Sequence, residues 1–449
     1  MNGRVAICVA LVAAFVGVVR AESPAVDRAA VGDEDLTAWL QSRIDRVSAA
    51  GGGEVGLGSG VYTVGGVFLK DGVTLRLDEG AVLQAVTNRA RYPHTPGWDR
   101  GAVVMADGAK GIAIVGRGVI DGRGGAMPLS TAAGRWRCVA LNRCRDVRIE
   151  DVTIRDAHSW ACYLKECDGA VVRGVTIRNH CNLNNDGLDV ESSNVLVENC
   201  DIDSEDDALV FKAMTHETYV TNVVVRNCRL SSNSSFIKVG SETRGVFRDF
   251  RVSDCRLEVR TRLSKRKGFA DVPGGATDLI GLDGIGVSIY DGGSLDGFTA
   301  ERITMGMGVG VPVFVRIGRS TRVEGTAAGG TFLRNVVIRD VSMEAPAVMR
   351  VPSTITGTPL LRPQNVRLEN VLLRTAADVP GDKIASPVPE MSEEYPVGKM
   401  FAKGGLAPAN ALYVRHADGV VLENFKVVRG AGPSTRDTIV ADDADVVRH

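Results

Sequence analysis

The chain has 449 residues, 44% of them hydrophobic, and its 53 basic and 54 acidic residues almost cancel. A net charge this close to zero argues against attraction of a polyanion such as nucleic acid by the whole molecule. Glycine is abundant, with 52 residues, while aromatic residues make up only 5%. This composition is typical of many short turns and aliphatic strands, and it disfavours a helical enzyme.

The first 21 residues have the features of a secretory signal. Arg4 supplies the positive charge, the segment 5–19 is apolar, and small residues flank a cleavage point after Ala21. We therefore expect a secreted or periplasmic protein that has no contact with a membrane once the signal is removed. An uncleaved membrane anchor is the alternative, and the short apolar stretch disfavours it.

The segment 35–50 predicts a helix that caps the N-terminal end of the structure. Leu36, Trp39, Leu40, Ile44 and Val47 recur at the helical spacing and share one face. The three glycines at 51–53 end the helix and lead into the first strands, 55–83.

A degenerate unit then recurs along the chain, with two short apolar runs on either side of a bend. The bend residues are Asp151, Gly174, Asn199, Asn227, Asp254, Asp340, Asn370 and Asn424. Spacings in the best-ordered part are about 23 to 28 residues, a period that indicates a solenoid. The apolar residues alternate as in half-buried strands. We predict an all-β fold, a right-handed parallel β-helix, forming a single catalytic domain over residues 22–449.

The cysteines follow the same repeat. Cys200, Cys228 and Cys255 occupy one repeat position, and Cys144 and Cys167 share another. In a β-helix such residues stack as small buried apolar groups, so we expect free thiols. Disulfides between Cys138 and Cys144 or between Cys162 and Cys181 are the alternative.

The segment 376–410 is rich in Pro, Glu and Gly and lacks the repeat. We interpret it as a long loop or lid before a final coil at Val420. If it closed one end of a groove, it would favour attack at chain ends.

Asn184-Asn185-Asp186-Gly187 and, twenty residues after Asp186, Asp206-Asp207 carry the candidate chemistry. Successive coils of a β-helix lie about 4.8 Å apart, so residues one coil apart become neighbours. Three carboxylates on one surface suit acid/base hydrolysis of a glycosidic bond, which needs one protonated acid and one ionised base. Crowding raises the pKa of one carboxyl group, so that it can act as the acid while another remains the base. We interpret Asp201 and Asp203 as solvated or turn residues.

These motifs resemble those of glycoside hydrolase family 28, the polygalacturonases and their relatives. Asn184-Asn185-Asp186-Gly187 is similar to the family's Asn-Thr-Asp-Gly segment, and Ser204-Glu205-Asp206-Asp207 to its Thr-Gly-Asp-Asp segment. The resemblance implies that Asp206 is the acid and that Asp186 and Asp207 share the base role. It extends over nearly the whole mature chain.

Two departures from the family pattern bear on the substrate. Where the family has a Gly-His-Gly motif, this chain has Ser234-Ser235-Phe236-Ile237-Lys238-Val239-Gly240, without histidine. Gly286-Val287-Ser288 replaces the family's Arg-Ile-Lys motif, which binds the substrate carboxylate. Simple polygalacturonate is therefore in doubt, and a branched pectin such as rhamnogalacturonan gains support.

Other residues are candidates for binding the substrate. Lys212 and Lys238 are candidate replacement cations, with solvated surface lysines as the alternative. Trp160 offers a ring on which a sugar can stack, and Asn184 belongs to the motif itself. His180 is a candidate substitute for the missing histidine, and a structural role for it is the favoured alternative. Arg260, Arg262, Lys265, Arg266 and Lys267 form a basic loop that is a further candidate for an acidic chain.

Together these features predict a secreted, inverting glycoside hydrolase. Its expected partner is an acidic plant polysaccharide or oligosaccharide containing α-linked galacturonic acid. We expect no cofactor, since no metal-ligand spacing is present, and no nucleic acid. Two alternatives stay open: a polysaccharide lyase on the same fold, whose product would absorb in the near ultraviolet, and a non-catalytic carbohydrate-binding solenoid.

Overall fold

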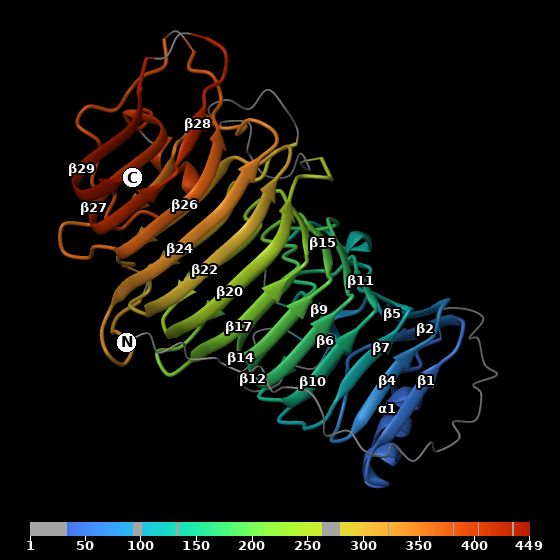
Figure 1. Ribbon diagram of the computed structural model, residues 1–449. Helices are drawn as coiled ribbons and strands as arrows, with labels where there is room; N and C mark the ends of the chain where they lie inside the picture. Colours follow the sequence, from blue (N-terminus) through green and yellow to red (C-terminus); the bar gives the residue numbers. More distant parts are fainter. Residues whose placement is uncertain are drawn as a thin grey trace.

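The computed structural model describes residues 34–92, 101–131, 134–262, 279–321, 323–379, 381–402, 404–432 and 435–449. All strand ladders among these residues are parallel, and each strand pairs with strands from the coils before and after it (Figure 1). The predicted parallel β-helix is therefore confirmed. The predicted signal at residues 1–21 lies outside the described residues.

Helix α1 (Thr37–Ala49) covers the N-terminal end of the β-helix, as predicted. Leu40 and Ile44 are fully buried against the first coils, and Trp39 stacks on Tyr62 with ring centroids 6.0 Å apart. The helix ends at Ala49, and the turn that follows contains Gly52, whose φ of +107° and close approach to Gly72 leave no room for a side chain. Among the described residues, no helix has the length and apolar character needed to cross a membrane.

The strands form three faces that run along the axis. Face A contains β3 (Val67–Phe68), β6 (Ala102–Asp107), β9 (Arg137–Asn142), β12 (Cys162–Arg173), β14 (Leu188–Glu198), β16 (Leu209–Ala213), β19 (Ile237–Thr243), β21 (Asp283–Ile289), β23 (Val311–Ile317), β25 (Ser353–Thr356), β27 (Ala409–Glu423) and β29 (Asp437–Arg448). Face B contains β1 (Gly53–Leu57), β4 (Val73–Leu77), β7 (Ala113–Gly116), β10 (Arg145–Glu150), β17 (Tyr219–Arg226), β20 (Val246–Leu257), β22 (Ser294–Met305), β24 (Phe332–Met343) and β26 (Gln364–Arg374), with the second halves of β12, β14, β27 and β29.

Face C contains β2 (Gly60–Val64), β5 (Ala81–Ala85), β8 (Val119–Asp121), β11 (Thr153–Arg155), β13 (Thr176–Asn179), β15 (Asp201–Ser204), β18 (Arg229–Ser232) and β28 (Lys426–Val428), with the ends of β20, β22, β24 and β26. Short 3-10 helices lie at Arg89–Arg91, Gly124–Ala126 and Gly398–Ala402. The interior is one continuous apolar core that runs from α1 to the last coil.

The repeated polar bend has a backbone cause. Asn199, Asn227 and Asp254 have φ values of +57°, +53° and +56°, in the left-handed region that Asn, Asp and Gly tolerate best. Stacked bends also bond to each other, since Asn227 Nδ2 donates to Asn199 Oδ1 at 2.6 Å. The bend residue thus allows the sharp turn between faces B and C.

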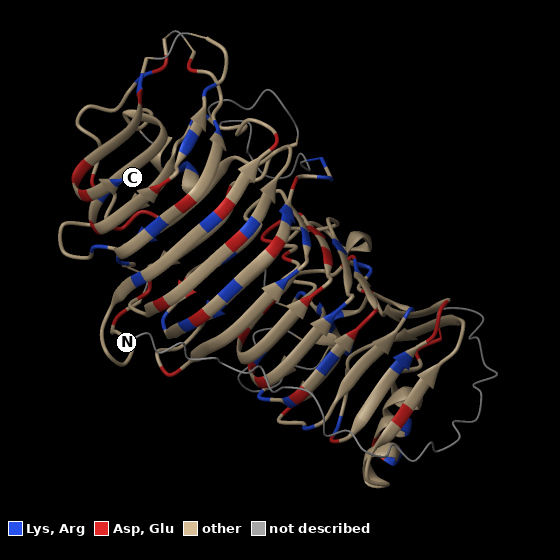
Figure 2. Cartoon of the chain, in the orientation of Figure 1, with Lys and Arg blue, Asp and Glu red and all other residues tan. Residues whose placement is uncertain are grey.

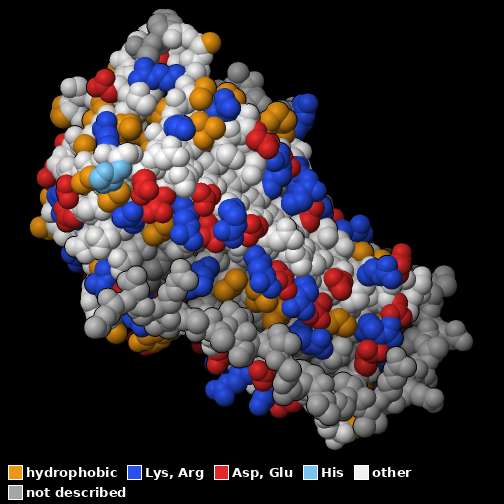
Figure 3. Space-filling model, viewed as in Figure 1, with side chains coloured by type: hydrophobic (Ala, Val, Ile, Leu, Met, Phe, Trp, Pro, Cys, Tyr) orange, Lys and Arg blue, Asp and Glu red, His pale blue; other side chains and the backbone are white. Residues whose placement is uncertain are grey.

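Face B is covered with charged side chains that pair between coils. Arg173 contacts Glu150 at 3.0 Å and Glu198 at 2.6 Å, and Arg226 continues the row at 2.6 Å from Glu198. Figure 2 shows opposite charges on neighbouring strands of the labelled β10–β26 face, and Figure 3 shows hydrophobic side chains scattered among charged ones on the same side. Exposed pairs of this kind contribute little stability each, but they give a solvated face.

The cysteine prediction holds for the described residues. All eight cysteines after the predicted signal are free thiols, and Cys200, Cys228 and Cys255 are buried. Their neighbours Asp201 and Arg229 are in register, as are Arg229 and Arg256, so the three thiols lie one above another. The two alternative disulfides are not formed.

Candidate active site

The three predicted carboxylates meet where the chain turns from face C to face A. Asp186 precedes β14, and Asp206 and Asp207 precede β16 on the next coil. The backbone fixes their register, because Asp206 N donates to Asn185 O at 3.3 Å and Gly187 N donates to Asp207 O at 2.9 Å. Asp186 and Asp207 therefore lie directly next to each other on successive coils.

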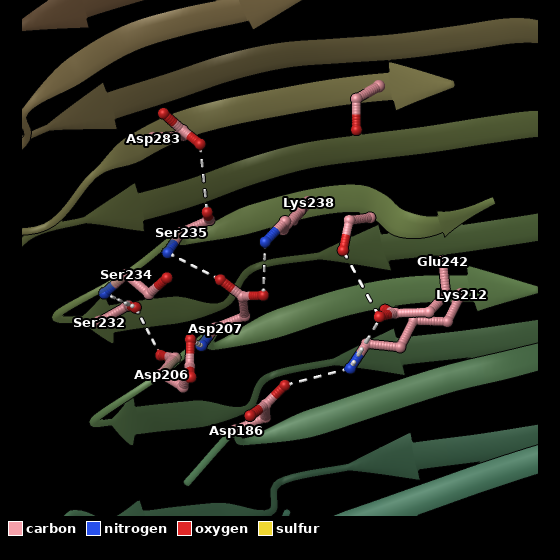
Figure 4. A network of polar contacts seen from close by, with 12 residues as sticks. Asp186, Asp206, Asp207, Lys212, Ser232, Ser234, Ser235, Lys238, Glu242 and Asp283 are labelled. Carbon is pink, nitrogen blue, oxygen red and sulfur yellow. Dashed lines mark hydrogen bonds and ion pairs between the residues drawn. The ribbon is translucent and has the colours of Figure 1, made fainter. Parts of the chain in front are cut away.

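All three carboxylates line one cavity of about 490 Å³. The cavity also contains four of the five predicted binding residues: Asn184, Trp160, Lys212 and Lys238. The remaining lining residues are Ser234, Ser241, Glu242, Leu282, Tyr395, Val397 and Lys399. Figure 4 shows the carboxylates and the two lysines pointing toward one another from adjacent coils.

Asp207 is held by an ammonium group and a backbone amide. Lys238 Nζ lies 2.9 Å from Asp207 Oδ2, and Ser235 N donates to Oδ1 at 3.0 Å. Burial lowers the pKa of Lys238, but the Asp207 carboxylate outweighs it and raises that pKa well above the usual value. Lys238 is therefore an ammonium group, and together with Ser235 it favours the charged form of Asp207.

Asp186 lies deeper in the same network. Its side chain is 3% exposed, and Lys212 Nζ donates to Oδ2 at 3.2 Å. Burial raises the pKa of Asp186 well above its usual value; Lys212 opposes this, while Asp189, Asp206 and Asp207 raise it further. In the substrate-free site Asp186 is thus inclined to hold a proton.

Asp206 is partly exposed and is oriented by the motif around it. Asn184 Nδ2 donates to Asp206 Oδ2 at 3.1 Å, and Asp207 N donates to Oδ1 at 3.1 Å. The hydroxyl of Ser232 holds the Asp206 backbone by donating to its carbonyl at 2.6 Å. Asn184 has a φ of +47°, a conformation that asparagine adopts more readily than most residues.

Asp189 is a member of the site that the sequence analysis missed. It is fully buried on β14, and its Oδ1 lies 2.7 Å from Lys212 Nζ. Burial raises its pKa to about 6, against the opposing effect of Lys212. Lys212 also lies 3.7 Å from the centroid of the Trp160 ring, a cation–π contact. In the sequence, Asp189 stands between Leu188 and Val190, whose side chains point into the core. Because side chains alternate along a strand, this pattern directs Asp189 away from the core.

The segment predicted to be a loop or lid contributes three lining residues. We call residues 381–402 the strap. Tyr395, Val397 and Lys399 come from it, and Tyr395 Oη lies 2.6 Å from the Ser241 hydroxyl. The strap therefore forms one wall of the cavity.

His180 is not among the residues that line the cavity. Its Nε2 lies 2.9 Å from Asp203 Oδ1, on the side of face C. Asp203 was wrongly interpreted as solvated: it is 5% exposed, and although burial raises its pKa, hydrogen bonds from His180, Ser231 and Thr261 outweigh this and lower it. His180 therefore contacts Asp203 and does not line the cavity.

The two departures from the family pattern also fall at the site. Ser235, in place of the histidine, contacts Asp207 through its backbone, and Gly286 is in register with Lys238 on the next coil. In the predicted basic loop, Arg260 pairs with Asp201 at 2.7 Å, while Lys265, Arg266 and Lys267 lie outside the described residues. Within the described residues, no group of three or more His, Cys, Asp or Glu side chains is arranged to hold a metal ion.

Comparison with known proteins agrees with these motifs. The family model described as glycosyl hydrolases family 28 matches residues 55–262. An endo-polygalacturonase from Pectobacterium carotovorum subsp. carotovorum is 24% identical over 216 residues, which are 42% of this chain and 54% of the relative. A polygalacturonase from Ralstonia solanacearum is 28% identical over 160 residues, 32% of this chain and 29% of the relative. The chain thus spans about half or less of the length of these two curated relatives.

Solved structures share the fold. A family 28 exopolygalacturonase from Yersinia enterocolitica gives a TM-score of 0.63 at 17% identity and covers 91% of this chain and 75% of that chain. A hyperthermoactive exopolygalacturonase from Thermotoga maritima gives 0.61 at 17% identity, covering 89% of each chain. The sequence comparisons support the resemblance to glycoside hydrolase family 28, and the solved structures share the fold.

Proposed function

We propose that this protein hydrolyses α-linked, galacturonic-acid-containing plant polysaccharide or its fragments, with inversion at the anomeric carbon. The observation that carries the proposal is the meeting of Asp186, Asp206 and Asp207 in one cavity, from two adjacent coils. The family match and the names of the relatives support the substrate class. The predicted signal at residues 1–21 supports export to the compartment where such a polymer is found.

The roles follow from the surroundings of each carboxylate. Asp206, the partly exposed one, donates a proton to the leaving glycosidic oxygen. Asp207, which Lys238 and Ser235 hold in its charged form, takes a proton from the attacking water. Inverting enzymes need carboxyl groups roughly 6.5–9.5 Å apart to fit that water. Asp186 shares the base role when Lys212 keeps it ionised, and its burial works against this.

Lysine groups in place of the Arg-Ile-Lys motif favour a uronate. Lys212 and Lys238 both line the cavity, but each is already paired with a carboxylate of the protein. A substrate carboxylate would therefore share these ammonium groups and not displace their partners. Trp160 offers a ring beside Lys212 for the sugar.

The first test replaces the acid. Asp206→Asn keeps the acceptor for Asp207 N and should lower sugar release from pectic oligosaccharides by at least about 1,000-fold. Asp151→Asn is the matched control, because Asp151 is exposed at a bend where other coils have Asn. Near-normal activity of Asp206→Asn, with unchanged circular dichroism, would remove Asp206 from the acid role.

The second test addresses the stereochemistry and the alternatives. Proton NMR of the first product should show the β anomer released from an α linkage. The α anomer would exclude inversion, and a product absorbing in the near ultraviolet would identify a lyase.

A non-catalytic carbohydrate-binding protein is the second candidate. It is favoured by Ser235 and Gly286, which stand where the family has a histidine and a cationic motif. Binding of pectic fragments without turnover, with equal affinity for wild type and Asp206→Asn, would support it over hydrolysis.

A further inference from the structure

The strap is joined to the catalytic coils by one buried carboxylate, Asp283 at the start of β21. Asp283 is 1% exposed, and its Oδ2 accepts a hydrogen bond from Ser235 Oγ at 3.3 Å. Ser235 in turn donates its backbone N–H to Asp207. Asp207, Ser235 and Asp283 thus occupy three successive coils, and each contacts the next (Figure 4).

The other oxygen of Asp283 holds the strap. Gly398 N donates to Asp283 Oδ1 at 2.9 Å, between the lining residues Val397 and Lys399. A Cβ on Gly398 would lie 2.3 Å from that oxygen and 2.8 Å from Val311, so only glycine fits at this contact. The strap therefore lies directly on β21 and β23.

Further contacts fix the strap on both sides of this point. The guanidinium of Arg316, which is 2% exposed, donates to Met391 O at 2.8 Å and to Gly357 O at 2.6 Å. Met400 and Phe401 are buried in a separate apolar cluster with Val311 and Phe314 of face A. These contacts are typical of a packed element and not of an open loop.

The position of the strap has a consequence for a polymer. Trp160, Asp186, Asp207 and Ser235 lie in register on successive coils, at the turn that leads into face A. Beyond them, at β21 and β23, the strap covers the same face through Gly398 and Met391. A sugar chain that ran along this face past Asp207 would collide with the strap.

We propose that Asp283 clamps the strap over β21 and thereby makes the cavity a closed-ended site, so that the protein cleaves at chain ends or in short oligosaccharides. Asp283 is a positioning residue in this proposal, acting through Gly398 and Ser235. The proposal rests on the proposed hydrolysis and adds the form of the substrate that the site accepts.

The experiment compares the products of polygalacturonate and of end-labelled oligogalacturonides. Wild type should release one product size from the chain end, with little loss of viscosity per bond cleaved. Gly398→Val and Asp283→Ala should detach the strap and raise the ratio of internal to terminal cleavage by about tenfold or more. Limited proteolysis near residue 398 shows whether the strap is released, independently of activity.

Two milder variants keep the test valid if these unfold. Asp283→Asn retains an acceptor for Gly398 N and should keep terminal cleavage, and Tyr395→Phe removes the hydroxyl that bonds to Ser241. Random internal products from wild type would overturn the proposal, as would an unchanged product pattern from a variant whose strap is cleaved by protease. If wild type cleaves no pectic substrate, the proposed function itself fails.

Discussion

Lys238 lies one coil beyond Asp207, and its Nζ is 2.9 Å from Asp207 Oδ2, with both side chains buried. It stands three residues after Ser235, in the stretch that corresponds to the family's Gly-His-Gly motif and contains no histidine. Lys238 supplies a positive charge to the site from β19, the strand that begins two residues after Ser235. The site therefore contains a fixed cation where the family has a group that titrates near neutral pH.

Replacing Lys238 should show how much the charge on Asp207 depends on it. Lys238→Met leaves the buried Asp207 carboxylate without its ion-pair partner and with only the Ser235 amide as a donor. We expect kcat/KM to fall about 100-fold, because the base is then no longer held in place for the attacking water. Lys238→Arg, which keeps the charge, is the control. A kcat/KM of Lys238→Met equal to that of wild type would contradict the assignment of Asp207 as base.

Lys212 should be required for folding as well as for activity. It is buried between Asp186 and Asp189, so Lys212→Met leaves two carboxyl groups without their cation and should cost about 3–5 kcal/mol of unfolding free energy. Asp189→Asn in the same chain removes one of these carboxylates and should recover part of the loss. Urea unfolding of the two single variants and the double variant measures the coupling. Additive effects within about 0.5 kcal/mol would contradict the pairing.

The repeat made most of the fold predictable, because each coil needs a left-handed bend between two short apolar strands. One coil escaped the alignment: β22 has Arg302 at the bend, with a φ of +53°, where other coils have Asn, Asp or Gly. An arginine at that position gives no sequence signal for a bend. Arg302 forms an ion pair, at 2.7 Å, with Asp254 on the preceding coil.

The part of the candidate site that depends on the register of adjacent coils was predictable from the sequence. Asp186 and Asp207 meet because they are about one period apart. The contact between Asp283 and Gly398 joins residues 115 positions apart, one of them in a segment without the repeat. No periodicity predicts such a contact. His180 shows the opposite error, since a histidine near the motif in sequence is directed to Asp203 by the local turn.

The stacked thiols should be unreactive in the native state. Cys200, Cys228 and Cys255 are at most 3% exposed and free, so reductant should leave the melting temperature unchanged. Cys228→Ala removes one sulfur from a packed column and should cost about 1–2 kcal/mol. Labelling with a thiol reagent, with and without denaturant, checks both statements. Rapid native labelling of these three residues, or a lower melting temperature in reductant, would contradict the stacking.

The contribution of Asp283 to stability should fall as the pH rises through the weakly acidic range, because this buried carboxyl group binds its proton more tightly in the folded state. For Asp283, burial first of all raises the pKa from 3.8 to about 6. Between these values the folded protein holds more protons than the unfolded chain, so the contribution of Asp283 is full below pH 3.8 and lost as the pH passes 6. At one pKa unit per 1.4 kcal/mol, the loss is at most about 3 kcal/mol.

Asp283→Asn should therefore flatten this slope and raise the unfolding free energy at pH 7 relative to wild type. Asp203→Asn is the matched contrast, because hydrogen bonds lower the pKa of Asp203 and outweigh its burial. Asp203 stabilises the fold when charged, so the asparagine variant should be less stable than wild type at pH 7 and approach it at low pH. Urea unfolding at pH values from 4 to 8 measures both. If Asp283→Asn kept the wild-type slope between pH 4 and 6, Asp283 would not be the buried proton-binding group that its place under the strap implies.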